Sequence, residues 1–360
     1  MNRPLNILIA GGGTGGHIFP AVAVANALRR LQPACNILFV GAQGKMEMEK
    51  VPQAGYDIKG LDIAGFNRTH WWKNLTLPWK LLKSFWQVQS IFKAFRPDAV
   101  FGVGGYSSYP VLKTAQAKGI PTFLHESNAF AGKANTMLGR RAAKVFVAVE
   151  GMQQFFPADR LMLTGNPVRS EIQNINIDAA SARRFFHLAA DKLTLLVIGG
   201  SLGARSINEA VHSGLAQLLA ADIQVLWQTG KAWQQTATNQ QVSQHTFIAD
   251  MDKAYAAADM VISRAGAMSV AELCMVGKPA VFVPFPFAAE DHQTANAMAL
   301  VNKHAAIIVK DADAAAQLVP AVLALAADAG KRQQMASNMA AQALRHADEV
   351  IAKTILKSVV

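Results

Sequence analysis

The sequence predicts an α/β protein with two domains, each built on a parallel β-sheet covered by helices. Its length is the first reason, because 360 residues exceed what one hydrophobic core usually supports. The second is the alternation of short apolar runs with segments of helical length, which is typical of buried parallel strands joined by crossover helices. The third is a glycine-rich turn that follows an apolar run near the start of each half.

Short apolar runs bounded by glycine or proline are the expected strands. In the first half they are residues 6–10, 37–40, 99–103, 122–125 and 145–148. In the second half they are residues 194–198, 224–228, 246–248, 260–263 and 280–283. The stretch 335–360 is predicted to be helical. Its periodicity alone leaves open whether it caps the second domain or returns to the first.

Each half opens with a strand, a glycine-rich turn and a helix. Residues 8–10 lead into the glycine-rich residues 11–16, and residues 196–198 lead into residues 199–203. This repeated order predicts two Rossmann-like domains that face a cleft. Pro167 biases the residue before it away from helix, which predicts a hinge at residues 165–167. The predicted domains are therefore 1–165 and 166–340, followed by a final helix over 341–360.

The chain carries an excess of positive charge and few cysteines. Its 35 Lys and Arg against 24 Asp and Glu favour either a polyanionic partner or a generally basic surface. Cys35 and Cys274 form no metal-binding spacing or disulfide framework, which fits a reducing compartment. No apolar run reaches the roughly 18 residues of a membrane-spanning helix, so the chain is expected to stay in the cytoplasm.

The first glycine-rich turn matches the pattern G-x-G-x-x-G of dinucleotide-binding enzymes. Those enzymes also need an acidic residue at the end of the second strand to hold the ribose, and residues 39–43 contain none. His17 follows Gly16 directly, at the mouth of the expected cleft. Beside a helix N-terminus an imidazole tends to stay neutral, and it can then act as a general base on a hydroxyl. The alternative is a histidine that only packs or caps there.

The segment 263–272 of the second half is the expected nucleotide site. Small residues at 265–267 let backbone amides approach a diphosphate at a helix start, and Ser269 can donate its hydroxyl. Glu272 lies one turn later on the same helix face, where a carboxylate can accept both ribose hydroxyls. The alternative for Glu272 is a capping box with Ser269.

Polar residues follow a predicted strand end further along, and they suit a sugar. They are Glu290, Asp291, His292, Gln293 and Asn296. Ligands bind at such strand ends in doubly wound sheets, and a sugar needs many hydrogen-bonding groups. No second histidine or carboxylate pair at ligand spacing accompanies them, and neither half contains D-x-D, so no metal is expected.

Residues 66–97 combine basic and aromatic side chains and contain no acidic residue. The basic residues are Arg68, Lys73, Lys80, Lys83, Lys93 and Arg96, interleaved with Trp71, Trp72, Trp79 and Trp86. A helix starting after Pro78 would bear one apolar stripe for the core, formed by Leu81, Phe85, Val88, Phe92 and Phe95. Its second stripe, formed by Trp79, Leu82 and Trp86 and flanked by lysines, is typical of a membrane-interface surface.

Two alternatives to a membrane surface remain for this segment. Trp79 and Trp86 could pack under another helix. Nucleic-acid binding also uses basic and aromatic residues, but no nucleic-acid motif accompanies them. Arg140, Arg141 and Lys144 could extend the basic patch.

An ordered set of motifs over the whole chain resembles the MurG family of glycosyltransferases. The motifs are GGTGGHIFPA at 12–21, GGYSS at 104–108, HESN at 125–128, TGNPVR at 164–169, GGS at 199–201 and SRAGAMSVAE at 263–272. The resemblance implies a GT-B fold whose final helix returns to the first domain. It implies inverting transfer of N-acetylglucosamine from UDP-N-acetylglucosamine to the C4 hydroxyl of undecaprenyl-diphosphate-linked N-acetylmuramyl-pentapeptide, in peptidoglycan synthesis and without a cofactor or donor-site metal. It further implies a peripheral protein at the cytoplasmic face of the bacterial inner membrane.

The resemblance also assigns roles to residues. Uracil would meet the backbone of Ile248, and the ribose would meet Glu272. The diphosphate would meet Ser201, Ala267, Met268 and Ser269, with Val270 and Ala271 in the same segment and Arg169 supplying positive charge. The sugar would meet Asn128, His292, Gln293 and Asn296, close to Thr14, Gly15 and Gly16. His17 becomes the preferred base for the acceptor hydroxyl, and Glu126 is the second candidate.

Two positions depart from the family pattern. Leu202 and Ser127 stand where a glutamine is frequent. Neither carries an assigned role, so the departures affect contact details only. The alternatives are another UDP-sugar GT-B enzyme, such as a glycolipid synthase or a UDP-N-acetylglucosamine 2-epimerase, and a non-catalytic nucleotide-sugar scaffold. Further partners would be other cell-wall enzymes.

Overall fold

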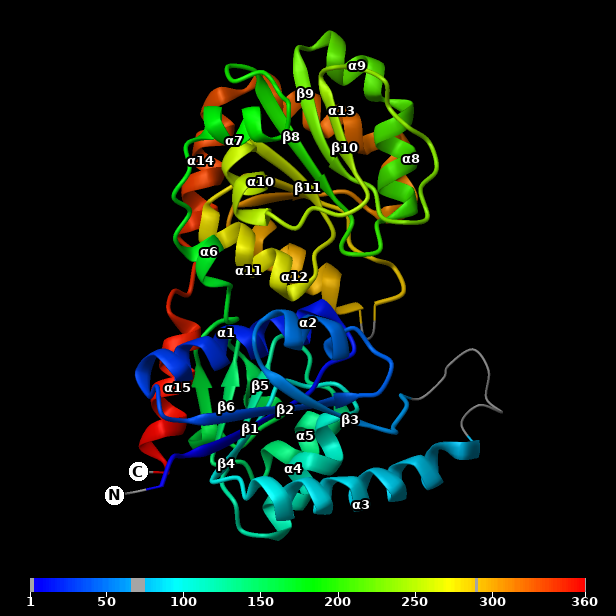
Figure 1. Cartoon of the computed structure of the whole chain (residues 1–360). Coiled ribbons are helices and arrows are strands. Elements are labelled where there is room, and N and C mark those ends of the chain that lie inside the picture. The colour runs from blue at the N-terminus through cyan, green and yellow to red at the C-terminus, as the bar shows by residue number, and fades with distance from the viewer. Residues whose placement is uncertain (1–2, 66–74, 289–290, 360) are drawn as a thin grey trace. The chain divides into compact units, whose positions relative to one another are not determined.

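The computed structural model describes residues 3–65, 75–288 and 291–359. The chain forms two compact units, here called unit 1 and unit 2 (Figure 1). Unit 1 comprises Met1–Arg169 and His346–Val360, and unit 2 comprises Ser170–Arg345. Each unit has its own parallel sheet with helices on both faces, which confirms the predicted α/β class.

The sheet of unit 1 has seven parallel strands in the order β3-β2-β1-β4-β5-β6-β7. The strands are β1 Asn6–Ala10, β2 Asn36–Ala42, β3 Asp57–Leu61, β4 Ala99–Gly102, β5 Thr122–Glu126, β6 Lys144–Val147 and β7 Leu161–Leu163. Successive side chains of a strand point to opposite faces, so one apolar strand supplies two cores. Ile7 and Ile9 of β1 lie in one core, whereas Leu8 and Ala10 lie in the other.

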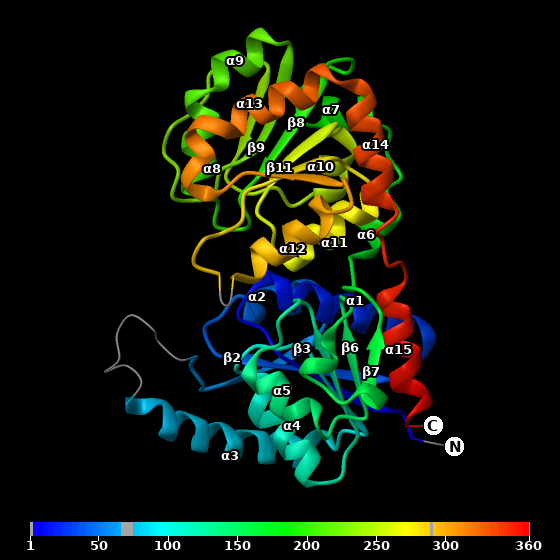
Figure 2. The ribbon, with the colours of Figure 1, turned by 180° about the vertical axis from the view of Figure 1, so that it is seen from behind.

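Helices cover both faces of this sheet (Figures 1 and 2). They are α1 Gly15–Leu31, α2 Glu47–Gln53, α3 Leu77–Phe95, α4 Ser108–Ala117, α5 Lys133–Gly139 and α15 Ala347–Lys357, with 3-10 turns at Met152–Gln154 and Ala158–Arg160. Ile351, Ala352 and Ile355 of α15 share the core of Ile7 and Ile9, beside α1. The last helix is thus part of unit 1.

The sheet of unit 2 has six parallel strands in the order β10-β9-β8-β11-β12-β13. The strands are β8 Leu193–Ile198, β9 Ile223–Gln228, β10 Val242–His245, β11 Met260–Ser263, β12 Ala280–Phe282 and β13 Ala306–Ile308. The helices are α6 Ser170–Gln173, α7 Ala179–Phe185, α8 Arg205–Ser213, α9 Leu215–Ala220, α10 Met251–Ala257, α11 Ala267–Val276, α12 His292–Val301, α13 Ala314–Ala327 and α14 Ala329–Ala340, with a 3-10 turn at Asp311–Asp313. Leu195, Val197 and Trp227 pack with Ile207 and Leu318 in its core.

The predictions that fail concern strands at sheet edges. The prediction of a strand at residues 246–248 is wrong, because β10 is Val242–His245, and β3, β7 and β13 were missed. All four are edge strands. An edge strand has one neighbour and is less buried than a central strand, so its sequence does not need a continuous apolar run.

The stretch 335–360 is helical, as predicted, but it is divided between two helices. Helix α14 ends at Ala340 and α15 begins at Ala347, after His346 with a left-handed φ of 61°. A residue in that conformation cannot continue a right-handed helix. No single described helix is long and apolar enough to cross a membrane, and the helix pair 311–327 and 329–340, bent by 101°, meets that criterion only jointly and by length and composition.

Candidate functional site

The first glycine-rich turn of unit 1 is built around a buried carboxylate. Glu47, the first residue of α2, is 1% exposed. Its carboxylate accepts hydrogen bonds from the backbone N–H of Gly13 at 2.8 Å and of Ala42 at 2.9 Å. The Gly13 amide is therefore bonded to a negative side chain. A pyrophosphate at this amide would meet like charge, which argues against the dinucleotide alternative.

His17 lies in the first turn of α1, where its backbone N–H donates to the Thr14 carbonyl at 3.1 Å. Its ring is half-buried, and its Nδ1 is buried without a hydrogen-bond partner among the described residues. Gly104 makes room for the ring, because a Cβ there would lie 3.0 Å from Cε1 of His17. Burial lowers the pKa of His17, against the opposing charge of Glu126, the Val103 carbonyl and Glu47. The imidazole is thus predominantly neutral at pH 7.

Glu126, the last residue of β5, is 5% exposed and surrounded by donors. Its Oε1 accepts from the backbone N–H of Asn128 at 3.2 Å and from the Asn128 side chain at 3.4 Å. Its Oε2 accepts from Asn135 Nδ2 at 2.8 Å and from the Gly132 N–H at 3.3 Å. The carboxylate therefore shapes the turn between β5 and α5 and fixes Asn128 in place.

The neighbouring His125 joins β5 to the predicted hinge. Burial lowers its pKa to about 4, so its ring is neutral. Its Nε2 lies 3.1 Å from the Gly165 carbonyl, which can only accept, so this nitrogen carries the proton. The Ser127 hydroxyl then donates to Nδ1 over 3.3 Å. Ser127, which departs from the family pattern, thus has a structural partner.

Arg169 stands at the end of unit 1. Its guanidinium lies over the ring of Phe19, 4.7 Å from the ring centroid, and Phe19 is two residues after His17 on α1. Thr14 is exposed, and Gly15 and Gly16 are half-buried at the start of the same helix. The predicted residues of unit 1 therefore cluster at the carboxyl ends of its strands, around the α1 N-terminus.

In unit 2, Gln228 ties together two predicted donor-binding segments. Its Oε1 accepts from the Ile248 N–H at 2.8 Å, and its Nε2 donates to the Gly200 carbonyl at 2.9 Å. The Ile248 N–H is therefore occupied, and its carbonyl is the group that can receive a uracil N–H. Ser201 is exposed in the turn that begins with Gly199 and Gly200.

Helix α11 presents its N-terminus at the end of β11. Its N-cap is Gly266, which has no capping side chain, and the following residues 267–271 are half-buried. The backbone N–H groups of the first turn of a helix point towards its N-terminal end, so those of Ala267, Met268 and Ser269 suit an anion. Because Gly266 is the N-cap, Ser269 lies inside the helix, and the capping-box alternative for Ser269 and Glu272 is wrong.

The carboxylate of Glu272 is oriented by a tyrosine. Glu272 is 8% exposed, and the Tyr255 hydroxyl of α10 donates to its Oε2 at 3.0 Å. Tyr255 is itself buried, and it has no sequence signal beyond an aromatic residue in a helix. No sequence motif therefore predicted its role.

The predicted sugar-binding amides of α12 also support neighbouring loops. Asn296 Nδ2 donates to the Ala265 carbonyl at 3.1 Å, and Gln293 Oε1 accepts from the Phe285 N–H at 3.0 Å. His292 is half-buried at the first turn of α12. Glu290 lies outside the described residues.

Arg264 is a further residue that the sequence analysis left without a role. Its Nη1 donates to the carbonyls of Val283 and Pro284 at 3.0 and 3.1 Å and to Asp311 at 2.5 Å. Its Nη2 donates to the Ser206 hydroxyl at 3.1 Å. Arg264 thus joins the chain after β11 and β12 to α8, directly before the α11 N-terminus.

Helix α3 exposes the predicted aromatic stripe. Trp79 and Trp86 are 75% and 73% exposed and Leu82 is 48% exposed, so the alternative that the tryptophans pack under another helix is wrong. Lys83 forms an ion pair with Asp62 at 2.7 Å, and Lys80 is half-buried. The core stripe is shorter than predicted: Leu81 is 36% exposed, and the helix buries Ser84, Val88 and Phe92. Arg68, Trp71, Trp72 and Lys73 lie outside the described residues.

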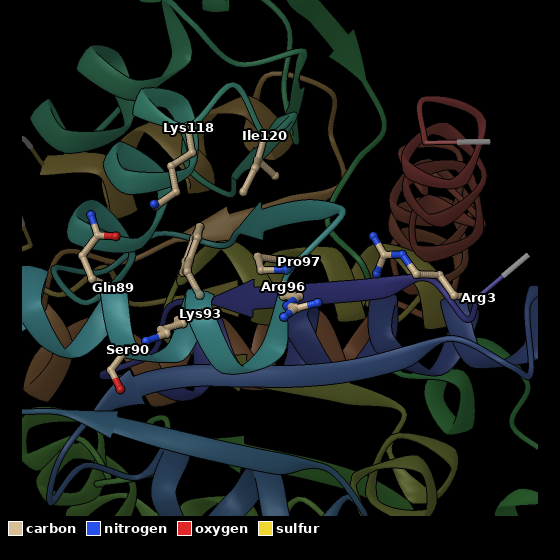
Figure 3. A pocket seen from close by; sticks show the side chains of 9 residues that line it. Arg3, Gln89, Ser90, Lys93, Arg96, Pro97, Lys118 and Ile120 are labelled. Atoms are coloured by element: carbon tan, nitrogen blue, oxygen red, sulfur yellow. The ribbon is translucent and has the colours of Figure 1, made fainter.

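A cavity of about 700 Å³ lies at the other end of the unit 1 sheet (Figure 3). It is lined by Arg3, Gln89, Ser90, Phe92, Lys93, Arg96, Pro97, Lys118 and Ile120. Pro97 and Ile120 precede β4 and β5, so the cavity lies at the amino ends of these strands, away from His17 and Glu126. Within the described part of the chain, no group of three or more His, Cys, Asp or Glu residues could hold a metal ion.

Models of one protein family match the sequences of both units. Residues 7–147 match the glycosyltransferase family 28 N-terminal domain, and residues 194–351 match the family's C-terminal domain. A Bacteroides thetaiotaomicron protein named UDP-N-acetylglucosamine–N-acetylmuramyl-(pentapeptide) pyrophosphoryl-undecaprenol N-acetylglucosamine transferase is 49% identical over 99% of this chain and 98% of its own. A protein of the same name from Parabacteroides distasonis is 45% identical over 99% and 98% of the two chains.

Solved structures lead to the same fold. Acinetobacter baumannii MurG is 31% identical, with a TM-score of 0.76 over 98% of this chain and all of its own. A UDP-N-acetylglucosamine 2-epimerase with a TM-score of 0.72 is 13% identical over 99% and 96% of the two chains, so it shares the fold alone. The predicted GT-B fold is thus confirmed, and the chain belongs to glycosyltransferase family 28.

Proposed function

We propose that the chain transfers N-acetylglucosamine from UDP-N-acetylglucosamine to the C4 hydroxyl of undecaprenyl-diphosphate-linked N-acetylmuramyl-pentapeptide. The observation that carries this proposal is 49% sequence identity, over nearly the full length of both chains, to a transferase whose name states this activity. The 2-epimerase shares the fold at only 13% identity, so it gives the epimerase alternative no support beyond the fold.

His17 is the better of the two candidate bases. A base needs a free lone pair within reach of the hydroxyl. Both oxygens of Glu126 already accept two hydrogen bonds each, and this residue is almost completely buried. His17 is half-buried and predominantly neutral. Because its Nδ1 is buried, Nε2 is the nitrogen that we assign to proton transfer.

The transfer is a single displacement. The acceptor C4 oxygen attacks the anomeric carbon of N-acetylglucosamine and loses its proton to Nε2 of His17. The bond from that carbon to the diphosphate oxygen breaks, and UDP leaves with the electron pair. The new bond forms on the opposite face of the sugar, so the configuration inverts to a β-linkage.

Unit 2 holds the donor and its leaving group. The diphosphate lies at the α11 N-terminus, where amides of Ala267, Met268 and Ser269 stabilise the charge that develops on UDP. Glu272 accepts the ribose hydroxyls, the Ile248 carbonyl receives the uracil N–H, and Ser201 contacts the diphosphate. Val270 and Ala271 complete this segment, and Arg169 adds positive charge. These groups supply the stabilisation without a donor-site metal or cofactor.

The remaining predicted residues contact either the sugar or the membrane. In unit 2, His292, Gln293 and Asn296 bind the hydroxyl and acetamido groups of the sugar. In unit 1, Asn128 and residues 14–16 stay the predicted sugar-binding residues. The exposed stripe of Trp79, Leu82 and Trp86, with Lys80 and Lys83, rests on an anionic membrane surface. This surface is the cytoplasmic face of the inner membrane, where the lipid-linked acceptor and other cell-wall enzymes are met.

Release of UDP tests the proposal. The purified chain is incubated with labelled UDP-N-acetylglucosamine and EDTA, with or without a short-chain lipid diphosphate muramyl-pentapeptide. We expect a lipid-linked disaccharide and UDP release only when the acceptor is present. UDP-N-acetylmannosamine formed without acceptor would establish an epimerase instead, and tight UDP binding with no product on the acceptor would establish a scaffold.

A further inference from the structure

The glycine-rich turn of unit 1 has an unusual partner for a loop of this pattern. Glu47 belongs to α2, yet its side chain reaches under residues 11–16 and bonds to Gly13. The same carboxylate bonds to Ala42 at the end of β2. It therefore connects the ends of two neighbouring strands, β1 and β2, beneath the turn.

The glycines around this carboxylate are the residues that make room for it. A Cβ at Gly12 would lie 2.4 Å from Cδ of Glu47, and a Cβ at Gly41 would lie 2.5 Å from its Cγ. Both distances are shorter than real side chains allow. Gly12 also has a φ of 149°, which L residues rarely adopt. Gly12 and Gly41 thus leave the space that the buried Glu47 carboxylate occupies. Glycine in this turn therefore serves the packing of an acid as well as the approach of a ligand.

The bond to Gly13 fixes the start of α1. Thr14, the next residue, is the extended N-cap of this helix. Its carbonyl accepts the N–H of His17 at 3.1 Å and of Ile18 at 3.2 Å. The path from the Glu47 carboxylate to the His17 backbone therefore runs through consecutive bonded residues. A displacement of Gly13 would displace the imidazole.

We propose that Glu47 is a positioning residue for the transfer, whose carboxylate holds the turn 11–16 and so places the His17 imidazole and sets its charge environment. The proposal rests on the assignment of His17 as the base. Geometry and charge are separate parts of this role, because one depends on the reach of the side chain and the other on its ionisation.

The charge part follows from the groups that face His17. These are Glu47 from α2 and Glu126 and His125 from β5. Burial lowers the pKa of His17, and the two carboxylates raise it, Glu126 more than Glu47. The negative charge of Glu47 also raises the pKa of Tyr106, after the effect of burial. Removal of the charge of Glu47 therefore lowers the pKa of His17.

Two substitutions separate charge from reach. Glu47→Gln keeps the size but removes the charge and turns an amide donor towards one of the two N–H groups. Glu47→Asp keeps the charge but shortens the reach by about 1.5 Å, the length of one carbon–carbon bond. Glu49→Gln is the matched control, because Glu49 is an exposed acid on the same helix.

The experiment measures kcat, the Kd for UDP and the titration of His17 by NMR of ring-labelled histidine, with the signal assigned by its absence in His17→Asn. We expect kcat to fall about 10–100-fold in both Glu47 variants, as for a displaced catalytic group, with the Kd for UDP unchanged. The pKa of His17 falls in Glu47→Gln, and Glu47→Asp leaves it close to the wild-type value. Glu49→Gln behaves as wild type in all three measurements.

A kcat within twofold of wild type in both Glu47 variants would overturn the proposal. So would a loss of kcat in Glu47→Gln with an unmoved His17 titration, since a purely structural role predicts that result. If Glu47→Gln does not fold, kcat and the Kd for UDP of Glu47→Asp decide. A wild-type chain that fails to glycosylate the acceptor refutes the proposed function, whereas wild-type transfer with unaffected Glu47 variants refutes only this inference.

Discussion

Nδ2 of Asn135 in α5 donates a hydrogen bond of 2.8 Å to Oε2 of Glu126, the last residue of β5. Both residues are buried. A buried carboxylate with four donors contributes to the native state chiefly by holding those donors in place. The relationship gives Glu126 a structural role, which supports the proposal that His17 accepts the proton.

Asn135→Ala, Glu126→Gln and their double variant test this view. Because the two side chains share one charge-assisted hydrogen bond, their effects on the free energy of unfolding should couple by about 0.5–3 kcal/mol. Urea unfolding of the four proteins measures the coupling. Additive effects would show that the bond is not formed in solution. A loss of kcat in Glu126→Gln as large as in His17→Ala, at unchanged stability, would make Glu126 the base.

His125 makes the stability of the chain depend on pH. Its folded pKa of about 4 lies below the ordinary value of 6.5. The unfolded chain therefore binds the extra proton first as pH falls, so this contribution to stability is complete above pH 6.5 and is lost progressively towards pH 4. The loss is on the order of 3 kcal/mol. His125→Gln should have a flatter dependence of unfolding free energy on pH in this window; an unchanged slope would contradict the assignment.

The Tyr255–Glu272 pair should set the preference for a ribose donor. Glu272→Ala removes the acceptor for the ribose hydroxyls, so the affinity for UDP should fall about 10-fold or more, as for a lost charge-assisted hydrogen bond. Calorimetry with UDP and 2′-deoxy-UDP should show that the variant discriminates less between them than wild type does. Tyr255→Phe should have a smaller effect in the same direction. Equal discrimination by all three proteins would remove Glu272 from the ribose site.

The exposed stripe of α3 should control membrane binding. Trp79→Ala with Trp86→Ala removes two large apolar side chains from the proposed interface, so partitioning to phosphatidylglycerol vesicles should fall at least about 10-fold. Phe287→Ala, which removes an 81% exposed aromatic from unit 2, is the control. Turnover of a water-soluble acceptor should be unchanged in both. Wild-type sedimentation of the double tryptophan variant with vesicles would place the membrane surface elsewhere.

The central strands of both sheets could be predicted from sequence because they are buried on both faces, as residues 6–10 and 194–198 illustrate. The edge strand Val242–His245 could not, since its residues are half-buried and three of the four are polar. The site residues could likewise be predicted only in part. His17 and Glu272 follow recognisable motifs, whereas Glu47, Tyr255 and Arg264 act through contacts between residues 17 to 47 positions apart. Only the folded chain reveals these partners.

The kinetics of His17→Ala show whether His17 is the general base. We expect kcat for transfer to the lipid-linked muramyl-pentapeptide to fall by about 10²–10⁴, as is usual when a general base is lost. The Kd for UDP should not change, because His17 is not among the residues proposed to bind UDP. A kcat equal to that of wild type would show that another group accepts the proton, and the assignment of His17 would have to be abandoned.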